Sequence, residues 1–372
     1  MFIKIIYDVD VLFNGFGLNE EMGNLLMRLL REINKVYNLS VILFTAALFI
    51  SGCGNAVSNA DIPDTWNAGR HYPLEIDNYD GYSGGGRLVH QIFTKPPERI
   101  VAASESTIDN LIFLGLEDKI VGIGDVAEDN HGEYEEIYKR IPRMGEKSYP
   151  PKESIIAARP DIIIGWGSLF GDKELGSVKN WHERGIHTYV MKNTVPVVLM
   201  ERRKVEYFIE DLHNLAKIFN IESSVKDRIE VLEKRMKMIK DRGDAVRREG
   251  GMRILTIQYV YDNQYFGRSR TDMTSDIIEL LGGISLDGET GGKQGVEFLI
   301  KLNPDVLLVI NHTKAPAKDK IKVLMENPAV QSVNAVKYKR FLILDYNAFY
   351  GGSERTIQEV ERLQDEIGNF EK

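Results

Sequence analysis

One long stretch of the chain repeats apolar residues at the spacing of an amphipathic helix. From Val225 to Ile239, apolar side chains recur at steps of three and four residues, and charged residues occupy most positions between them. The pattern predicts a helix over 221–249, with Ser223 or Ser224 as its N-cap and a pair of glycines after its end. At 1.5 Å per residue, about 25 residues extend roughly 38 Å, which exceeds the width of a small domain. An ordinary surface helix would show the same pattern, so the flanking segments decide its role.

The segments on the two sides of this helix repeat one pattern. The sequence ESIIAARPDIII at 153–164 aligns without a gap with EFLIKLNPDVLL at 297–308. Each copy predicts a short helix that begins at a glutamate, a Pro-Asp break and a buried strand. Upstream, 109–116 matches 276–283 as a helix closed by glycine. Two copies are too few for a solenoid, so we predict two equivalent lobes joined by the long helix, with a ligand cleft between them.

Strands alternate with helices within 98–220 and again within 250–372, which we assign as the N-terminal and C-terminal lobes. This alternation predicts the α/β class, with two Rossmann-like lobes built on mainly parallel sheets. Ligands of such sheets bind beyond the carboxyl ends of the strands. In the N-terminal lobe the residues predicted to follow strand ends are Ser104, Glu105, Ser106, Asp125, Trp166, Gly167 and Ser168.

Tyrosine and arginine gather after the predicted strands of the C-terminal lobe. Guanidinium groups pair with carboxylates or catecholates, and a phenol ring offers apolar contact area with a polar tip. The pattern therefore favours an anionic, partly aromatic ligand, although solvated loops and helix-turn positions would explain the same residues. The candidates for ligand binding are Tyr259, Tyr261, Tyr265, Arg268, Arg270, Tyr346, Tyr350 and Arg355.

Composition narrows the possible functions. With 372 residues, 43% hydrophobic and 27% charged, the chain is long enough for two cores, and its net charge of −8 argues against nucleic acid as a partner. A single cysteine excludes an internal disulfide and a zinc site built on several thiolates. The chain has no HExxH motif, phosphate loop, dinucleotide fingerprint or nucleophile elbow, so we predict no catalytic residues, no metal site and no cofactor. His131 or His312 as an axial haem ligand stays open.

The N-terminal region has the pattern of a secretory signal. A net-basic start and a short apolar run over 27–52 precede Cys53, and the run is too short for a transmembrane helix. The ending FISGC resembles the lipobox of bacterial lipoproteins, in which the cysteine is lipidated; a buried core cysteine is the alternative. The pattern predicts a lipoprotein held on the extracytoplasmic face of the cell membrane.

Residues on either side of this signal need separate interpretation. Residues 1–26 contain acidic side chains that a signal start avoids, so we expect them not to belong to the true chain, which would begin at Met27 or Met22. Residues 53–97 are rich in Asn, Asp, Gly, Tyr and Pro and predict a tether that ends in a short hairpin around 72–93.

The order of these segments over about 95–365 resembles one family, the substrate-binding proteins of iron-siderophore, haem and cobalamin ABC importers. The resemblance rests on the blocks PPERIVAASESTIDNLIFLGLEDKIVGIGD, ESIIAARPDIIIGW, GIHTYVM, VEFLIKLNPDVLLVI and AVKYKRFLILD, on the long helix, and on GSER at 352–355. It implies two Rossmann-like lobes bridged by one rigid helix and delivery of a ligand to a membrane permease. The family's usual proline after the first strand is absent, because 104–106 reads Ser-Glu-Ser.

The resemblance also implies the ligand and the partners. A chelated metal compound is expected, with a ferric siderophore first because of the Arg and Tyr content, and haem, cobalamin or an oxyanion as alternatives. An enzyme or a sensor on the same scaffold is a lesser alternative. In this family a glutamate in each lobe docks onto arginines of the two-fold symmetric permease, and the matching residues here are Glu153 and Glu297. We expect a monomer that docks onto the permease dimer.

Overall fold

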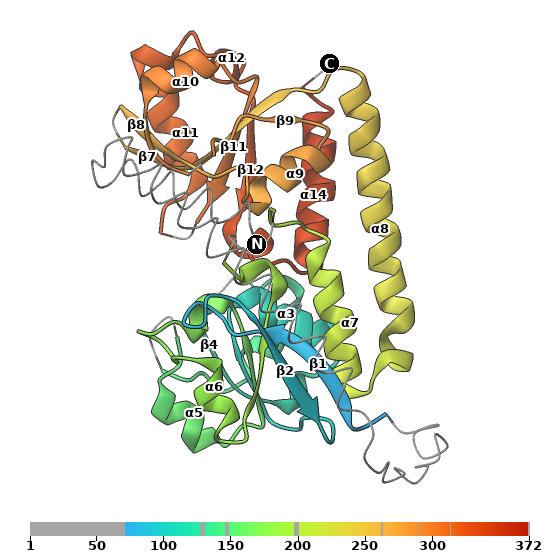
Figure 1. The fold of residues 1–372 in the computed structure, drawn as a ribbon. Helices are drawn as coiled ribbons and strands as arrows, with labels where there is room; N and C mark the ends of the chain where they lie inside the picture. The colour runs from blue at the N-terminus through green and yellow to red at the C-terminus, as the bar shows by residue number, and fades with distance from the viewer. Residues whose placement is uncertain are drawn as a thin grey trace, which may run out of the picture. The chain divides into compact units, whose positions relative to one another are not determined.

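The computed structural model describes residues 71–126, 131–145, 149–196, 201–261, 263–289, 291–312 and 314–370. The predicted signal segment and Cys53 lie outside these residues. Among the described residues, no helix combines the length and apolarity that crossing a membrane requires. Figure 1 shows two α/β lobes and one long helix beside them.

The sheet of the N-terminal lobe is fully parallel, and helices cover both of its faces. Its strands are short apolar runs, as expected where both faces are buried. Ile100 and Ala102 contribute to one core, while Val101 and Ala103 point to a second core on the opposite face. The strand order is β4 (Ile120–Gly124), β3 (Ile100–Ala103), β5 (Ile162–Gly165) and β6 (His187–Val190). The helices and 3-10 turns are α3 (Glu105–Phe113), η2 (Glu117–Lys119), η3 (Gly132–Tyr134), α4 (Glu135–Tyr138), α5 (Lys152–Ala158), η4 (Gly167–Phe170), α6 (Val178–His182), η5 (Lys192–Thr194) and α7 (Tyr207–Phe219).

The sheet of the C-terminal lobe is mixed. Four of its six strands run parallel, and the other two pair antiparallel at one edge, because the short connection after Tyr261 returns the chain beside the strand that it has just left. The main order is β10 (Gly292–Gly295), β8 (Gln264–Gly267), β7 (Arg253–Tyr261), β11 (Val306–Asn311) and β12 (Phe341–Asp345), and β9 (Ile284–Ser285) also pairs with β7. The helices are α9 (Met273–Leu280), α10 (Val296–Leu302), α11 (Ala317–Glu326), η7 (Pro328–Val330), α12 (Asn334–Lys337), α13 (Tyr346–Phe349) and α14 (Glu354–Ile367).

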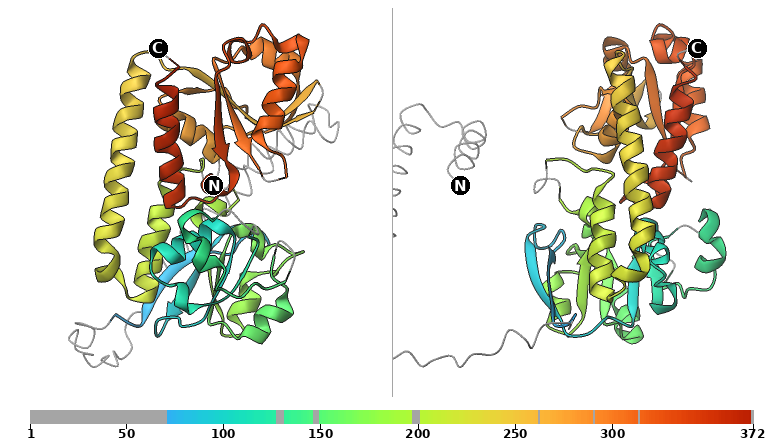
Figure 2. Two further views of the ribbon diagram at one scale, coloured as in Figure 1. Left: turned by 180° about the vertical axis from the view of Figure 1, so that it is seen from behind. Right: turned by 90° about the vertical axis from the view of Figure 1, so that its right-hand side faces the viewer.

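The long helix α8 (Glu222–Arg248) runs along both lobes, as Figures 1 and 2 show. Its predicted apolar stripe is buried. The helix contacts α7 of the N-terminal lobe and α9 and α14 of the C-terminal lobe. The predicted serine caps are wrong: Ile221 is the N-cap, and Ser224 Oγ donates to the Ile221 carbonyl inside the first turn. Near its end, a Cβ at Gly243 would lie 2.3 Å from the Leu280 carbonyl oxygen, so only glycine allows α8 and α9 to approach this closely.

A two-stranded hairpin precedes the first lobe. β1 (Leu74–Tyr79) and β2 (Leu88–Phe93) pair antiparallel. The side-chain amides of Asn78 and Gln91 each accept from and donate to the backbone of β6, at Val190 and Thr188 respectively. These bonds imitate a neighbouring strand and so cover the exposed edge of the sheet. The described end of the predicted tether is therefore packed onto the lobe.

Candidate functional site

The first turn after β3 joins the two lobes. The structure differs from the predicted loop over 104–106, because Ser104 is the residue before α3 and the next two residues belong to the helix. All three are buried. Glu105 Oε1 accepts from Asn347 Nδ2 at 3.2 Å, and Ser106 Oγ accepts from Trp166 Nε1 at 3.1 Å. Glu105 therefore contacts a side chain of the C-terminal lobe.

Arg355 strengthens this connection from the start of α14. Its Nη1 lies 3.5 Å from Asp109 Oδ2 and 3.8 Å from Glu105 Oε2, and its side chain is largely buried. Asn110 Nδ2 donates to the Gly352 carbonyl at 3.0 Å. Burial raises the pKa of Asp109 to about 6, while the Arg355 guanidinium acts in the opposite direction. These polar contacts hold α3 of one lobe against α14 of the other.

Aromatic side chains from both lobes meet beside this connection. The rings of Trp166, which follows β5, and Tyr350, which follows α13, have centroids 4.8 Å apart. Tyr346 stacks on Tyr350 at 5.1 Å, and the His312 ring lies 5.1 Å from Tyr346. Burial and the neighbouring Tyr350 raise the pKa of Tyr346, which keeps its hydroxyl protonated at neutral pH. Trp166, Tyr346 and His312 all follow the carboxyl ends of strands, where the topology predicts a ligand site.

Two arginines converge next to this aromatic cluster. Arg268, whose side chain is 14% exposed, donates to Asp272 and to Gln258, and its guanidinium carbon lies 5.6 Å from the Tyr350 ring centroid. Arg203 Nη1 lies 3.7 Å from the same Asp272 carboxylate. Two guanidinium groups thus share one carboxylate, which also caps α9 by accepting from Thr274 N. Arg203, Arg268 and Asp272 together carry a net charge of +1, which is available to attract an anion.

Sequence reasoning missed Arg203 and Tyr82. Arg203 precedes α7 in a loop, and its guanidinium is held by the carbonyls of Asn193 and Val195. Tyr82, in the turn of the β1–β2 hairpin, donates its backbone N–H to the Gly167 carbonyl at 3.0 Å. Burial raises the pKa of the Tyr82 hydroxyl, and the positive charge of the nearby Arg203 acts in the opposite direction. Neither residue directly follows a strand of the parallel sheets, so the rule that located the other candidates does not apply to them.

The other predicted residues of the C-terminal lobe lie in three separate settings. Tyr265 is buried in the core of the lobe, because alternation along β8 turns it inward and Phe266 outward. Tyr259 lies 6.0 Å from Tyr261 and 6.3 Å from Phe266, which gives the β7–β8 hairpin an aromatic surface. Arg270 is 60% exposed and pairs with Glu289 at 2.6 Å.

The comparisons with known proteins agree with this architecture. The sequence model of the family described as "Periplasmic binding protein" matches residues 100–348. The chain belongs to this family. It is 24% identical over 340 residues to the petrobactin-binding protein YclQ of Bacillus subtilis (strain 168), covering 89% of this chain and 98% of the relative. It is 22% identical over 328 residues to the uncharacterized ABC transporter substrate-binding lipoprotein YvrC of the same strain, covering 87% and 95%.

Among solved structures, a periplasmic binding protein from Veillonella parvula DSM 2008 matches with a TM-score of 0.68 and 22% identity, covering 80% of this chain and 92% of the other. This match supports the two-lobed α/β fold predicted for a periplasmic binding protein. The predicted family and fold class are therefore confirmed.

The two glutamates of the internal repeat occupy equivalent places in this periplasmic binding protein. Glu153 is the second residue of α5 and Glu297 the second residue of α10, and both are exposed. In the sequence, each helix stands between two strands of its sheet: α5 between β4 and β5, and α10 between β10 and β11. It begins at the edge of the sheet where the preceding strand has ended. Because the helix then runs back before the next parallel strand, its first turn lies near the carboxyl ends of the strands.

The two histidines considered as haem ligands lie in different surroundings. His131 is buried and stacks on Tyr138 at 3.9 Å, inside the N-terminal lobe, whereas His312 lies beside Tyr346. Within the part of the chain that the structure describes, no group of three or more His, Cys, Asp or Glu side chains is arranged to hold a metal ion. Of the two residues considered for an axial haem role, His312 is the one beside the aromatic cluster.

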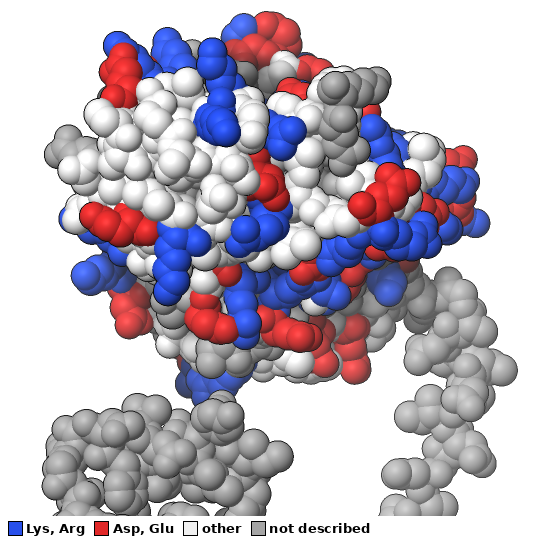
Figure 3. Space-filling model, turned by 90° about the horizontal axis from the view of Figure 1, so that it is seen from above, with Lys and Arg blue, Asp and Glu red and all other residues white. Residues whose placement is uncertain are grey.

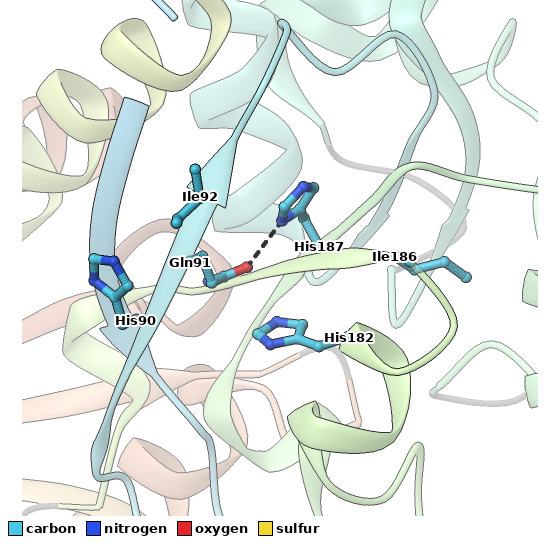
Figure 4. Close-up of a pocket in the computed structure, with 7 residues that line it drawn as sticks. His90, Gln91, Ile92, His182, Ile186 and His187 are labelled. Atoms are coloured by element: carbon cyan, nitrogen blue, oxygen red, sulfur yellow. Dashed lines mark hydrogen bonds between the residues drawn. The ribbon is translucent and has the colours of Figure 1, made fainter. Parts of the chain in front are cut away.

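A pocket on the N-terminal lobe lies where the hairpin covers β6 (Figure 4). His187 Nδ1 lies 3.4 Å from Gln91 Oε1, and its ring stacks on Phe93 at 4.1 Å. His182 Nε2 lies 2.9 Å from Thr188 Oγ1, and burial together with His187 lowers the pKa of His182 to about 4. The pocket lies at the amino end of β6, away from the carboxyl ends of the parallel strands, and we assign it to packing of the hairpin.

Proposed function

We propose that this protein is the substrate-binding component of an ABC importer and captures a chelated metal compound, first of all a ferric siderophore. The observation that carries the proposal is the meeting of Arg203 and Arg268 with Trp166, Tyr346 and Tyr350. Ferric siderophore complexes are commonly anionic and expose large organic surfaces. Guanidinium groups would pair with their carboxylate or catecholate oxygens, while the aromatic rings would cover the organic part.

The relatives support the same ligand class. YclQ is named as a petrobactin-binding protein, and YvrC as a substrate-binding lipoprotein of an ABC transporter. In this proposal Ser106 and Trp166 provide the N-terminal side of the site, Tyr82 lies at its margin, and Tyr259, Tyr261 and Arg270 contact only the outer part of a large ligand. Ser104, Glu105 and Arg355 hold the lobes together beside the site. Little lobe movement is expected on binding.

Haem is the second candidate, because the His312 ring, whose centroid lies 5.1 Å from that of Tyr346, offers an imidazole nitrogen ligand at the side of the aromatic cluster. Burial and the nearby Lys320 lower the pKa of His312, so its imidazole is neutral and able to bind a metal. Cobalamin and an oxyanion remain as further alternatives within the same family.

Titration of the purified protein with ferric petrobactin, ferric citrate, haem and cobalamin tests the ligand class. We expect a ferric siderophore complex to quench the tryptophan fluorescence of the protein, to which Trp166 contributes, at submicromolar concentration and without turnover. Visible absorption of protein purified from its own host identifies the ligand independently, since each metal complex has its own bands. Haem bands that disappear in His312→Ala would instead establish the haem alternative. Turnover of a bound compound would contradict a binding protein.

Lipid anchoring completes the proposal. Cys53 would be the first residue of the mature protein and would carry the lipid. This lipid would include at least two acyl chains, because a single chain gives only marginal anchoring. We expect Cys53→Ala to accumulate as an unprocessed precursor whose mass also reports the true start of the chain. A processed, soluble Cys53→Ala protein would exclude the lipobox assignment.

A further inference from the structure

The equivalent helices α5 and α10 carry an exposed isoleucine three residues after Glu153 and Glu297, respectively. Ile156 on α5 is 48% exposed, and Ile300 on α10 is 38% exposed. Residues three apart on a helix are surface neighbours, so each isoleucine lies beside the glutamate of its own helix. The gap-free alignment of the repeat makes the two isoleucines equivalent, as it does Glu153 and Glu297.

Packing of the lobes does not require these isoleucines. The preceding residues, Ile155 and Leu299, are the equivalent inward-facing side chains, and both are 0% exposed. A single exposed apolar side chain is ordinary on a protein surface. The same side chain at the same place in both lobes, each time next to an exposed glutamate, indicates a shared function.

The same set of contacts fixes both helices. After α5, the Asp161 carboxylate accepts from the backbone N–H of Arg99, whose guanidinium donates to the Ala158 and Arg159 carbonyls at the end of the helix. After α10, the Asp305 carboxylate likewise accepts from the N–H of Arg253, whose guanidinium donates to the Leu302 and Asn303 carbonyls. Both helices end in a left-handed residue, Arg159 and Asn303.

This repeated clamp has a consequence for recognition. In each lobe an arginine and an aspartate at the starts of two adjacent strands, β3 and β5 or β7 and β11, hold the short helix at its carboxyl end. The glutamate and isoleucine are therefore presented on a rigid element. A preorganised surface loses little conformational entropy when it binds. A helix of 7 residues would otherwise have few contacts to fix its direction.

The side of the C-terminal lobe that carries α10 and α12 has a broad uncharged area. Figure 3 looks onto the side where α10 and α12 lie in Figure 1, and uncharged side chains form a broad area there between separate acidic and basic groups. Phe298, next to Glu297, is 39% exposed and enlarges the apolar surface on this lobe. Its equivalent in the other lobe is Ser154, so the isoleucine is the apolar element common to both.

We propose that α5 and α10 each present a docking surface to the importer's two-fold symmetric permease dimer. Ile156 and Ile300 form the apolar centres of these two docking surfaces and insert into equivalent recesses of the permease. The inference rests on the proposed function of the chain in an ABC importer. Two copies of one Glu-Ile pair match a partner that presents one surface twice. The glutamates set orientation and encounter, and desolvation of the isoleucines gives the complex its lifetime.

A binding measurement tests these separate roles of the glutamates and the isoleucines. The full, ligand-loaded protein is added to the importer permease of the same host, which is held in lipid nanodiscs. We expect Ile156→Ser and Ile300→Ser each to weaken binding about tenfold, and the double variant more, through faster dissociation. The dependence of binding on salt should stay as in the wild type. Val231→Ser on α8 is the matched control, since Val231 is an aliphatic side chain that is 53% exposed and lies outside both docking surfaces.

The outcomes separate this inference from the function on which it rests. If the double isoleucine variant binds the permease as the wild type does while Glu153→Arg with Glu297→Arg does not, the apolar role is wrong and docking through the glutamates stands. If both double variants bind normally, docking through α5 and α10 is wrong altogether. Failure of the wild-type protein to bind overturns the proposed function and this inference together. Circular dichroism and thermal unfolding verify that each variant is folded.

Discussion

Glu153→Arg combined with Glu297→Arg is expected to abolish uptake of the ligand while leaving ligand affinity and folding nearly unchanged. Both carboxylates are exposed at the first turn of equivalent helices. Opposite charges across such a surface steer the encounter and fix the orientation of the partners. Reversing them places like charges against the basic groups that we expect on the permease, and each single variant should lose part of the uptake.

The effect is measured as ligand uptake by cells in which the variant replaces the wild-type binding protein. Ligand titration and thermal unfolding of the purified variant report its affinity and its folding. Glu183→Arg combined with Glu233→Arg is the matched control, because it changes the net charge of the protein by the same amount. Glu183 directly follows α6, Glu233 lies on α8, and both are exposed. Wild-type uptake should weaken as salt is raised, because screening shortens the range of the attraction. Normal uptake by the anchored Glu153→Arg, Glu297→Arg variant would refute the docking role, and lost ligand binding would place these residues in the cleft.

The internal repeat predicted the lobes because it combines local signals. A glutamate, an apolar helix of two turns, a Pro-Asp break and a buried strand are each readable within a few residues, and their recurrence sets the architecture. The packing of the hairpin was not predictable in this way. It depends on Asn78 and Gln91 bonding to β6, more than 90 residues later, and amides in a Gly- and Asn-rich segment also suit a loop.

The candidate site divides along the same line. Trp166 and Tyr346 follow strands, and the parallel topology alone predicts that such residues gather at one edge. Tyr265 was misplaced, although alternation along β8 identifies which of Tyr265 and Phe266 faces the core once the strand is recognised. Arg203 depends on a loop whose position is set by carbonyls of the segment around η5, and its sequence carries no periodic signal.

Arg268→Ala is expected to weaken ligand binding about ten- to more than a hundredfold, corresponding to roughly 1.5 to 3 kcal/mol for a hydrogen bond to a charged group. Arg268 is largely removed from water, aligned by Gln258 and Asp272, and adjacent to Tyr350. Arg270→Ala is the matched control and should bind nearly as the wild type, because its side chain is 60% exposed and its pair with Glu289 is screened by solvent.

Titration of both alanine variants with the ligand found in the native protein measures the difference. Arg268→Lys adds a second comparison, since lysine keeps the charge but loses the planar fork that engages two oxygens, and should recover only part of the affinity. Asp272 caps α9 and also faces Arg203, so thermal unfolding must show that the folded state of Arg268→Ala is preserved. If a folded Arg268→Ala protein binds as tightly as the wild type, the ligand does not use this guanidinium. A large loss in Arg270→Ala alone would move the ligand toward the exposed β7–β8 hairpin, where Tyr259 and Tyr261 form the aromatic surface.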